Sequence, residues 1–314
     1  MNIKFFEPVN FKEAAALLAE YGDDAKIIAG GTAMVLMLRQ KLISPAVLVS
    51  LGRIQTDSDP SEIAPIPEQG ASSSRDAALV PPVIRKALAP VVKQGNLHLG
   101  ALTSLRLVEQ SSVVRQFCPA LAHSYSVVGN IRIRNQATVG GNLAEADYAS
   151  DPPSMLLALN ARVGLMQPNS TRELPFSEFT LGFYTTALES AEIVTDVIIP
   201  PLSERAKTSY HKFSSRSAED RPCVVVAALV ELDPDGRCTD LRVAVGAAIE
   251  IPQRLKQVES SAIGQKLNDD LIASIGDEYA HQLDPLSDVR GSAWYRREMI
   301  SVIVRRSLTA LKLV

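Results

Sequence analysis

Two glycine pairs carry the strongest chemical signal in the sequence. The first lies in Ala29-Gly30-Gly31-Thr32, and the second lies in Thr138-Val139-Gly140-Gly141-Asn142. Adjacent glycines let backbone N–H groups approach a phosphate without an intervening Cβ. The side chains of Thr32, Thr138 and Asn142 can add further hydrogen bonds. Two separate loops of matching chemistry suit a diphosphate that is held from both sides, as in a dinucleotide.

Neither loop follows a common nucleotide-binding pattern. The sequence contains neither G-x-G-x-x-G nor G-x-x-x-x-G-K-[ST] at these places, so it gives no support for a Rossmann or P-loop site. A single glycine pair is most often only a tight turn. The prediction of a diphosphate site therefore depends on the two loops together.

The elements around the first loop predict a small α/β unit. Residues 11–21 have helical spacing, and a short strand over 26–29 runs into the loop. An apolar helix is expected over 34–40, and the β-branched run 46–51 predicts a buried strand. A helix start just beyond the loop would favour a bound anion.

A middle unit is expected to carry the second loop. Residues 56–76 are rich in Ser, Pro, Asp and Glu, and we expect a flexible excursion over about 56–95, with helical spacing over 82–93. A strand over 130–135 is expected to lead into the second loop. The remaining expected elements are a strand at 96–101, helices at 105–110, 112–122 and 153–160, and a strand near 163–166.

The last third of the chain differs in character, because consecutive strands come before helices. Such an order favours an α+β domain. The sequence Asp233-Pro-Asp-Gly236 predicts a hairpin turn between two of the strands. The strands are expected at 192–199, 209–213, 224–232 and 241–247, and the helices at 269–282 and 292–311.

Composition narrows the class of protein. The 314 residues carry a formal net charge of −3, so no basic field favours nucleic acid. The longest apolar run, 223–230, is too short to span a membrane, and the first twenty residues lack a signal-peptide core, so we expect a cytoplasmic protein. The three cysteines and four histidines are scattered without a C-x-x-C pair, which predicts no metal site and no iron–sulfur cluster on this chain.

The segments KIIAGGTAMVLMLRQ (26–40) and IRIRNQATVGGNLAEADYASDPPSMLLALNARV (131–163) resemble the flavin-binding subunit of molybdenum hydroxylases. This family includes the medium chain of aerobic carbon monoxide dehydrogenase and the flavin part of xanthine dehydrogenase. The resemblance covers nearly the whole chain apart from about 56–95. Ala33 and Glu145 depart from the family's usual residues. Further matching stretches are 97–105, 192–200, 210–216 and 292–308.

The resemblance implies a fold, a cofactor and partners. The fold would be α+β, with a vanillyl-alcohol-oxidase-type FAD-binding fold in two subdomains, 1–55 and 56–175, and a C-terminal domain of antiparallel strands and helices, 176–314. FAD would bind to this chain. The partners would be a large molybdopterin-binding subunit and a small subunit with two [2Fe–2S] clusters, assembled as a dimer of heterotrimers. This chain would pass electrons from the clusters to an external acceptor.

The resemblance also implies roles for individual residues. Ala29, Gly30, Gly31 and Thr32 match the first pyrophosphate loop, and Thr138, Gly140, Gly141 and Asn142 match the second. Asp151 matches an acidic position near the ribityl chain, although it also suits a helix N-cap before two prolines. Lys212 matches a lysine near the flavin ring, although an exposed lysine is usually only solvated.

Three apolar or aromatic residues match positions beside the isoalloxazine. Ile193 and Val194 would pack on the ring, although any buried strand contains such residues, and Tyr184 would shield one face. No residue is expected to act as a general acid or base, because FAD supplies the redox chemistry. The alternatives are a stand-alone FAD-dependent oxidase or reductase, and a scaffold subunit that has lost FAD. The organic substrate and the acceptor, whether NAD, quinone, oxygen or a protein, stay open.

Overall fold

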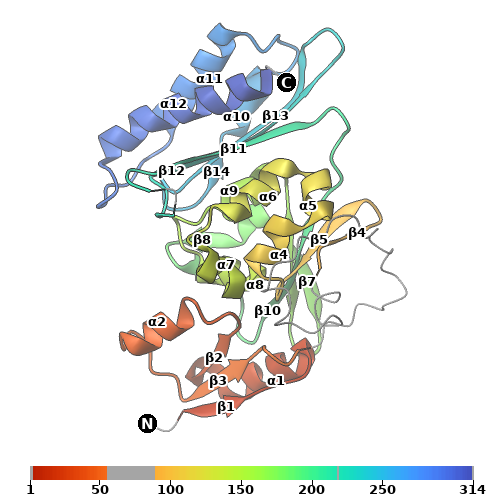
Figure 1. Ribbon diagram of the computed structural model, residues 1–314, viewed down its shortest axis with the longest axis vertical. Helices are drawn as coiled ribbons and strands as arrows, with labels where there is room; N and C mark the ends of the chain where they lie inside the picture. Colours follow the sequence, from red (N-terminus) through yellow and green to blue (C-terminus); the bar gives the residue numbers. More distant parts are fainter. Residues whose placement is uncertain (1–2, 55–88, 218, 313–314) are drawn as a thin grey trace.

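The computed structural model describes residues 3–54, 89–217 and 219–312. Three units follow one another along the long axis of the molecule, with the N-terminal unit at one end and the C-terminal unit at the other (Figure 1). Residues 55–88, which hold most of the expected excursion at 56–95, lie outside the described residues.

The N-terminal unit is a three-stranded parallel sheet with one covering helix. Asn10 caps the helix α1, where its side chain accepts a hydrogen bond from Glu13 N, and the buried Ala14 and Ala15 pack against the sheet. The strand order is β1-β3-β2. The four predicted elements are confirmed to within a residue: α1 (Phe11–Tyr21), β2 (Ala25–Ile28), α2 (Met34–Arg39) and β3 (Val47–Ser50). The strand β1 (Lys4–Phe6) was not predicted.

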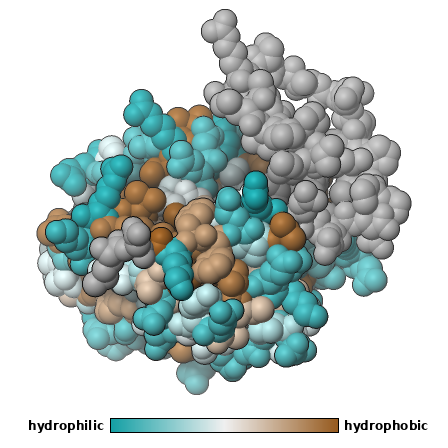
Figure 2. Space-filling view, turned by 90° about the horizontal axis from the view of Figure 1, so that it is seen from below, coloured by the Kyte–Doolittle hydropathy of each residue, from teal (hydrophilic) through white to brown (hydrophobic). Residues whose placement is uncertain are grey.

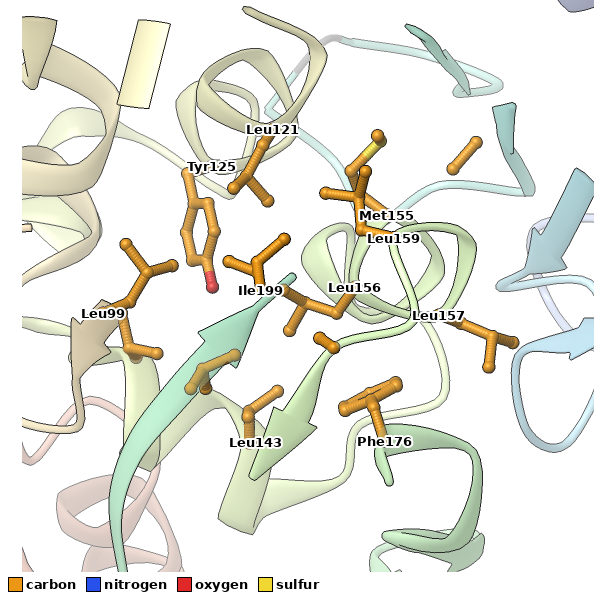
Figure 3. Close-up of a cluster of buried hydrophobic side chains, with 14 of the residues drawn as sticks. Leu99, Leu121, Tyr125, Leu143, Met155, Leu156, Leu157, Leu159, Phe176 and Ile199 are labelled. Carbon is orange, nitrogen blue, oxygen red and sulfur yellow. The ribbon is translucent and has the colours of Figure 1, made fainter. Parts of the chain in front are cut away.

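The middle unit is a five-stranded antiparallel sheet with helices packed against it. The strand order is β4-β5-β10-β6-β7. Figure 3 shows part of its core, where Tyr125 lies among Leu99, Leu121 and Ile199. The strands are β4 (Val91–Lys93), β5 (Asn96–Gly100), β6 (Arg162–Met166), β7 (Thr171–Pro175) and β10 (Ile193–Ile199). The helices are α4 (Leu105–Gln110), α5 (Ser112–Phe117), α6 (Pro119–Ser126), α7 (Ile131–Gln136), α8 (Val139–Glu145) and α9 (Pro152–Ala158).

Three expectations for the middle unit are wrong. The helix expected over 112–122 is divided into α5 and α6, because Cys118 is extended before Pro119, which begins the second helix. Residues 131–136 form the helix α7 rather than a strand, because the Asn130 side chain accepts hydrogen bonds from the N–H groups of Arg132 and Ile133 and so caps a helical turn. Residues 91–93 form the strand β4 rather than the end of a helix. Gln94 and Gly95 both have positive φ, which closes a tight hairpin between β4 and β5.

Strand β10 was expected among the C-terminal strands, but it pairs with β5 and β6 at the centre of the middle sheet. A register shift between Val194 and Asp196 interrupts its pairing with β6. Ile193 belongs to the core of the N-terminal unit, whereas Val194 belongs to the core of the middle unit. A small hairpin, β8 (Thr180–Gly182) and β9 (Thr185–Thr186), precedes β10.

The C-terminal unit is a four-stranded antiparallel sheet, in the order β11-β12-β13-β14, that is covered on both faces. Along β12, Val225 and Ala227 face the middle unit's core, whereas Val224 and Val226 face α11 and α12. The continuous apolar run of β12 follows from burial on both faces. The elements are β11 (Lys207–Phe213), β12 (Val224–Leu232), β13 (Cys238–Gly246), β14 (Gln253–Arg254), α10 (Lys256–Ser261), α11 (Asp269–Gln282) and α12 (Ala293–Lys312).

None of the helices described here is both long and apolar enough to cross a membrane. Figure 2, which views the molecule from the end that carries the N-terminal unit, shows apolar residues interleaved with hydrophilic ones on this face.

Candidate functional site

The first glycine loop connects β2 to α2 and presents a run of free backbone donors. Within the described part of the chain, the N–H groups of Gly30, Gly31, Thr32 and Ala33 have no hydrogen-bond acceptor. Gly31 has a φ of +72°, a backbone conformation that glycine adopts without strain. Successive N–H groups in such a turn form a concave nest that suits an anion. The loop thus provides unpaired donors of the kind that a phosphate requires.

The second glycine loop differs, because its donors are already used. Thr138 caps α8 by accepting a hydrogen bond from Gly141 N. The N–H of Val139 donates to the Thr103 carbonyl at 2.9 Å, and the N–H of Gly140 donates to the Ala101 carbonyl at 2.8 Å. Gly141 is exposed, so this loop offers a bare backbone surface rather than free N–H groups.

The fold places Gly30 of the first loop against the backbone that leads into the second loop. A Cβ on Gly30 would lie 1.9 Å from the carbonyl oxygen of Gln136 and 3.0 Å from Cα of Ala137, immediately before the second loop. A Cβ on Gly140 would lie 2.7 Å from Cβ of Ala101, at the end of β5. Glycine is therefore required at both positions by close approach. The expectation that both loops serve one site is consistent with this contact.

Asp151 lies in a buried polar cluster between the middle and C-terminal units. Its side chain does not cap α9. Instead, Oδ1 accepts a 2.7 Å hydrogen bond from the Tyr210 hydroxyl, and Oδ2 accepts a 3.1 Å hydrogen bond from Lys212 Nζ. Lys212 also donates to the Val127 carbonyl, and its side chain is only 7% exposed. Asp151 thus occupies the N-cap position of α9 without making a capping hydrogen bond, and the alternative role of Lys212 as a solvated lysine is wrong.

Burial and the neighbouring positive charge change the pKa of Asp151 in opposite directions. Burial raises the pKa of this carboxyl to about 6, and the Lys212 charge and the Tyr210 hydrogen bond oppose this rise. The same burial, together with the neighbouring carboxylate, raises the pKa of Tyr210 well above its ordinary value, so Tyr210 remains a neutral donor. The cluster adjoins the second loop, because the Asn142 side chain hydrogen-bonds Ser150 at 2.9 Å.

Comparison with known families decides what binds here. The family described as the FAD binding domain in molybdopterin dehydrogenase matches residues 1–62 and 84–202, and the CO dehydrogenase flavoprotein C-terminal domain matches residues 209–311. The chain belongs to the FAD-binding medium subunits of the molybdenum hydroxylase family.

Individual relatives agree with this assignment of the medium subunit. The glyceraldehyde dehydrogenase medium chain of Sulfolobus acidocaldarius is 30% identical over 95% of this chain and 94% of its own length. A 6-hydroxypseudooxynicotine dehydrogenase complex subunit alpha of Paenarthrobacter nicotinovorans is also 30% identical, over 95% of this chain and 90% of its own length. The solved carbon monoxide dehydrogenase of Hydrogenophaga pseudoflava has the same fold, with a TM-score of 0.85 at 24% identity, covering 99% and 97% of the two chains.

The residues of this medium subunit fit FAD. The unpaired N–H groups of Gly30 to Ala33 suit the pyrophosphate, and the bare surface at Gly141 leaves room for it to approach. Ala29, the first residue of the first loop, is half-buried and packs against the core of the N-terminal unit. Within the described ranges, no cluster of three or more His, Cys, Asp or Glu side chains could hold a metal ion.

The three residues that were predicted to contact the flavin ring differ in their exposure. Tyr184 is half exposed, and its N–H donates to the carbonyl of Ala146 at the end of α8. Ile193 and Val194 are 3% and 5% exposed and are enclosed in protein cores. The structure thus places Tyr184 at the end of α8, the helix that begins at the second glycine pair. It leaves little surface of Ile193 or Val194 open to a ligand.

Sequence reasoning missed Tyr210. Its position two residues before Lys212 places both side chains on the same face of β11, because strand side chains alternate. That spacing is the signal that pairs Tyr210 with Lys212. A second network, formed by Tyr148, Asp288 and Arg290, was also missed, and no sequence pattern joins residues 140 positions apart.

Proposed function

We propose that this medium subunit takes electrons from [2Fe–2S] clusters on a small partner subunit and passes them to an external acceptor. A large molybdopterin-binding subunit would oxidise the organic substrate, and the complex would be a dimer of heterotrimers. The observation that carries the proposal is a donor-rich first glycine loop packed against the backbone that leads into the second, within a chain matched over most of its length by the family's two domains. The relatives are themselves described as a medium chain and as a subunit of a complex.

The chain's contribution is binding, orientation and electrostatics. FAD supplies the electron-accepting chemistry when it is bound. The first loop would hold the pyrophosphate, and the second would limit where it can lie. Asp151 would hold the charged Lys212 and the neutral Tyr210 hydroxyl by fixed hydrogen bonds beside the cofactor, in a buried setting where charge is weakly screened.

The test separates cofactor binding from substrate oxidation. Acid precipitation of the purified chain should release non-covalently bound FAD at about one per chain. The chain is then mixed anaerobically with purines, aldehydes and N-heterocycles, with and without co-expressed partner chains, while the flavin absorbance is recorded. We expect bleaching by dithionite in every sample, but bleaching by substrate only when the partners are present. Steady turnover of a substrate by this chain alone would favour the stand-alone flavoenzyme.

A further inference from the structure

The β8–β9 hairpin holds exposed apolar side chains beside the C-terminal end of α8, the helix that begins at the second glycine pair. Leu181, Phe183 and Tyr184 are each about half exposed. Tyr184 has a φ of +53°, a left-handed conformation that bulky side chains rarely adopt and that persists only when surrounding contacts enforce it. Its N–H donates to Ala146, which ends α8 and also has a positive φ. The glycine pair lies in the first turn of that helix, about 8 Å away at 1.5 Å per residue.

A contact between two aromatic rings holds the β8–β9 hairpin in place. The ring of Tyr148 meets the ring of Phe183 edge to face, with centroids 5.1 Å apart and planes at 88°. The Tyr148 hydroxyl donates a 2.8 Å hydrogen bond to Asp288 Oδ2. The Arg290 guanidinium lies over the Tyr148 ring, 5.2 Å from its centroid, and also hydrogen-bonds the Tyr148 hydroxyl. Tyr148 therefore joins the hairpin to a loop of the C-terminal unit.

Asp288 is itself held rigidly. It accepts hydrogen bonds from the backbone N–H of Arg290 at 2.7 Å and from Arg296 Nη2 at 2.6 Å. Arg296 is fully buried and donates its other Nη to the Ala247 carbonyl, just beyond β13. Burial alone would raise the pKa of Asp288, but its hydrogen bonds to Arg290 and Tyr148 and the Arg296 charge hold that pKa well below its usual value. The anchor is thus an ionised carboxylate fixed from two sides.

We propose that Tyr148 is a positioning residue for the cofactor: through Asp288, the C-terminal unit holds the β8–β9 hairpin so that Tyr184 contacts the ring system of bound FAD. The inference depends on the place of FAD beside α8. It does not depend on which partner supplies electrons. Removal of the Tyr148 ring frees the hairpin and weakens FAD binding without touching either glycine loop.

The experiment measures FAD affinity and FAD-linked stability in six proteins: wild type, Tyr148→Ala, Tyr148→Phe, Tyr184→Ala, the double variant Tyr148→Ala/Tyr184→Ala and a control. Tyr295→Ala is the matched control, because this tyrosine also belongs to a ring pair, with Phe213, but does not touch the hairpin. Apoprotein is titrated with FAD, and the Tm is recorded with and without saturating FAD. A ligand raises Tm according to its affinity, so a variant that weakens binding shows a smaller FAD-induced rise.

We expect Tyr148→Ala and Tyr184→Ala each to weaken FAD binding about two- to tenfold, the size of a lost aromatic contact. Tyr148→Phe should lose less, because it keeps the ring. In the Tyr184→Ala background, Tyr148→Ala should weaken FAD binding no further. An equal fall of apo and holo Tm in Tyr148→Ala, with the FAD-induced rise unchanged, would show a purely structural role and overturn the proposal. Unchanged affinity in Tyr184→Ala would overturn the placement of the hairpin on FAD, while leaving electron transfer through the complex untouched.

Discussion

Gly30→Ala tests whether the first glycine loop must touch the backbone that leads into the second. The new Cβ would lie 1.9 Å from the carbonyl oxygen of Gln136 and 2.7 Å from its carbonyl carbon, and both atoms are backbone at the end of α7. A carbon needs about 3.3 Å from a carbonyl oxygen, so the first loop must retreat by about 1.4 Å. Overpacking of this kind costs about 1–3 kcal/mol of unfolding free energy.

The effect on FAD follows from the same displacement. Hydrogen bonds from N–H groups to a charged phosphate contribute about 1.5–3 kcal/mol each. Loss of a single one weakens binding by roughly tenfold to a hundredfold, since 1.4 kcal/mol is a factor of ten. We therefore expect Gly30→Ala to bind FAD at least tenfold more weakly than wild type, in addition to its lower stability.

Fluorescence titration of apoprotein with FAD gives the Kd, and urea unfolding of the apoprotein gives the stability. Gly52→Ala is the control: among the described residues, its Cβ would meet only the Ser50 hydroxyl, at 3.4 Å, in the same unit. This variant should bind FAD normally. Wild-type affinity and wild-type stability in Gly30→Ala would refute the requirement for close approach.

Gly141→Val should strip FAD while the far-UV circular dichroism stays near wild type, because Gly141 is exposed and the valine would cover its backbone and crowd the Thr138 hydroxyl, 2.9 Å from the new Cβ; a normal flavin content would remove Gly141 from the site. Burial raises the pKa of Asp151 to about 6. Between about pH 4 and pH 6, the folded protein therefore keeps a proton on Asp151 that the unfolded chain releases. Its contribution to unfolding free energy should therefore fall by about 3 kcal/mol as pH rises from about 4 to above 6. Urea titrations across this range should show a flatter pH dependence in Asp151→Asn. Lys212→Met leaves a buried carboxylate unpaired and should cost about 3–5 kcal/mol at pH 8, but less at pH 5, where Asp151 takes up a proton; an equal loss at both pH values would contradict the pairing.

The first loop was predictable because every local signal around it agreed. The strand, the glycine pair and the following helix lie in one short segment, so periodicity and turn chemistry were sufficient. The element that leads into the second loop was harder to predict. Alternating Ile and Arg in residues 131–134 suits a strand, but the Asn130 cap and the ion pair of Arg134 with Glu109 stabilise a helix instead. The cap is local, whereas the partner of Arg134 lies 25 residues away.

The pairing of side chains in the two polar clusters could be found only from the three-dimensional structure. Asp151 meets Lys212 and Tyr210 only because α9 packs against the sheet that contains β11. Asp288 meets Tyr148 across an even larger separation in the chain. Sequence resemblance indicated that Asp151 and Lys212 matter, but it gave no sign that they bind each other. Pairing between distant side chains is a property of tertiary packing, which periodicity does not encode.

The course of β10 has a consequence for how this protein can be divided. Ile193 and Val194 are consecutive, yet each closes the core of a different unit. A fragment that stopped at residue 175 would expose both cores at once, and the central strand of the middle sheet would be missing. The N-terminal and middle units should therefore melt in a single cooperative transition rather than one after the other. Any truncated form meant to retain the flavin must continue past residue 199.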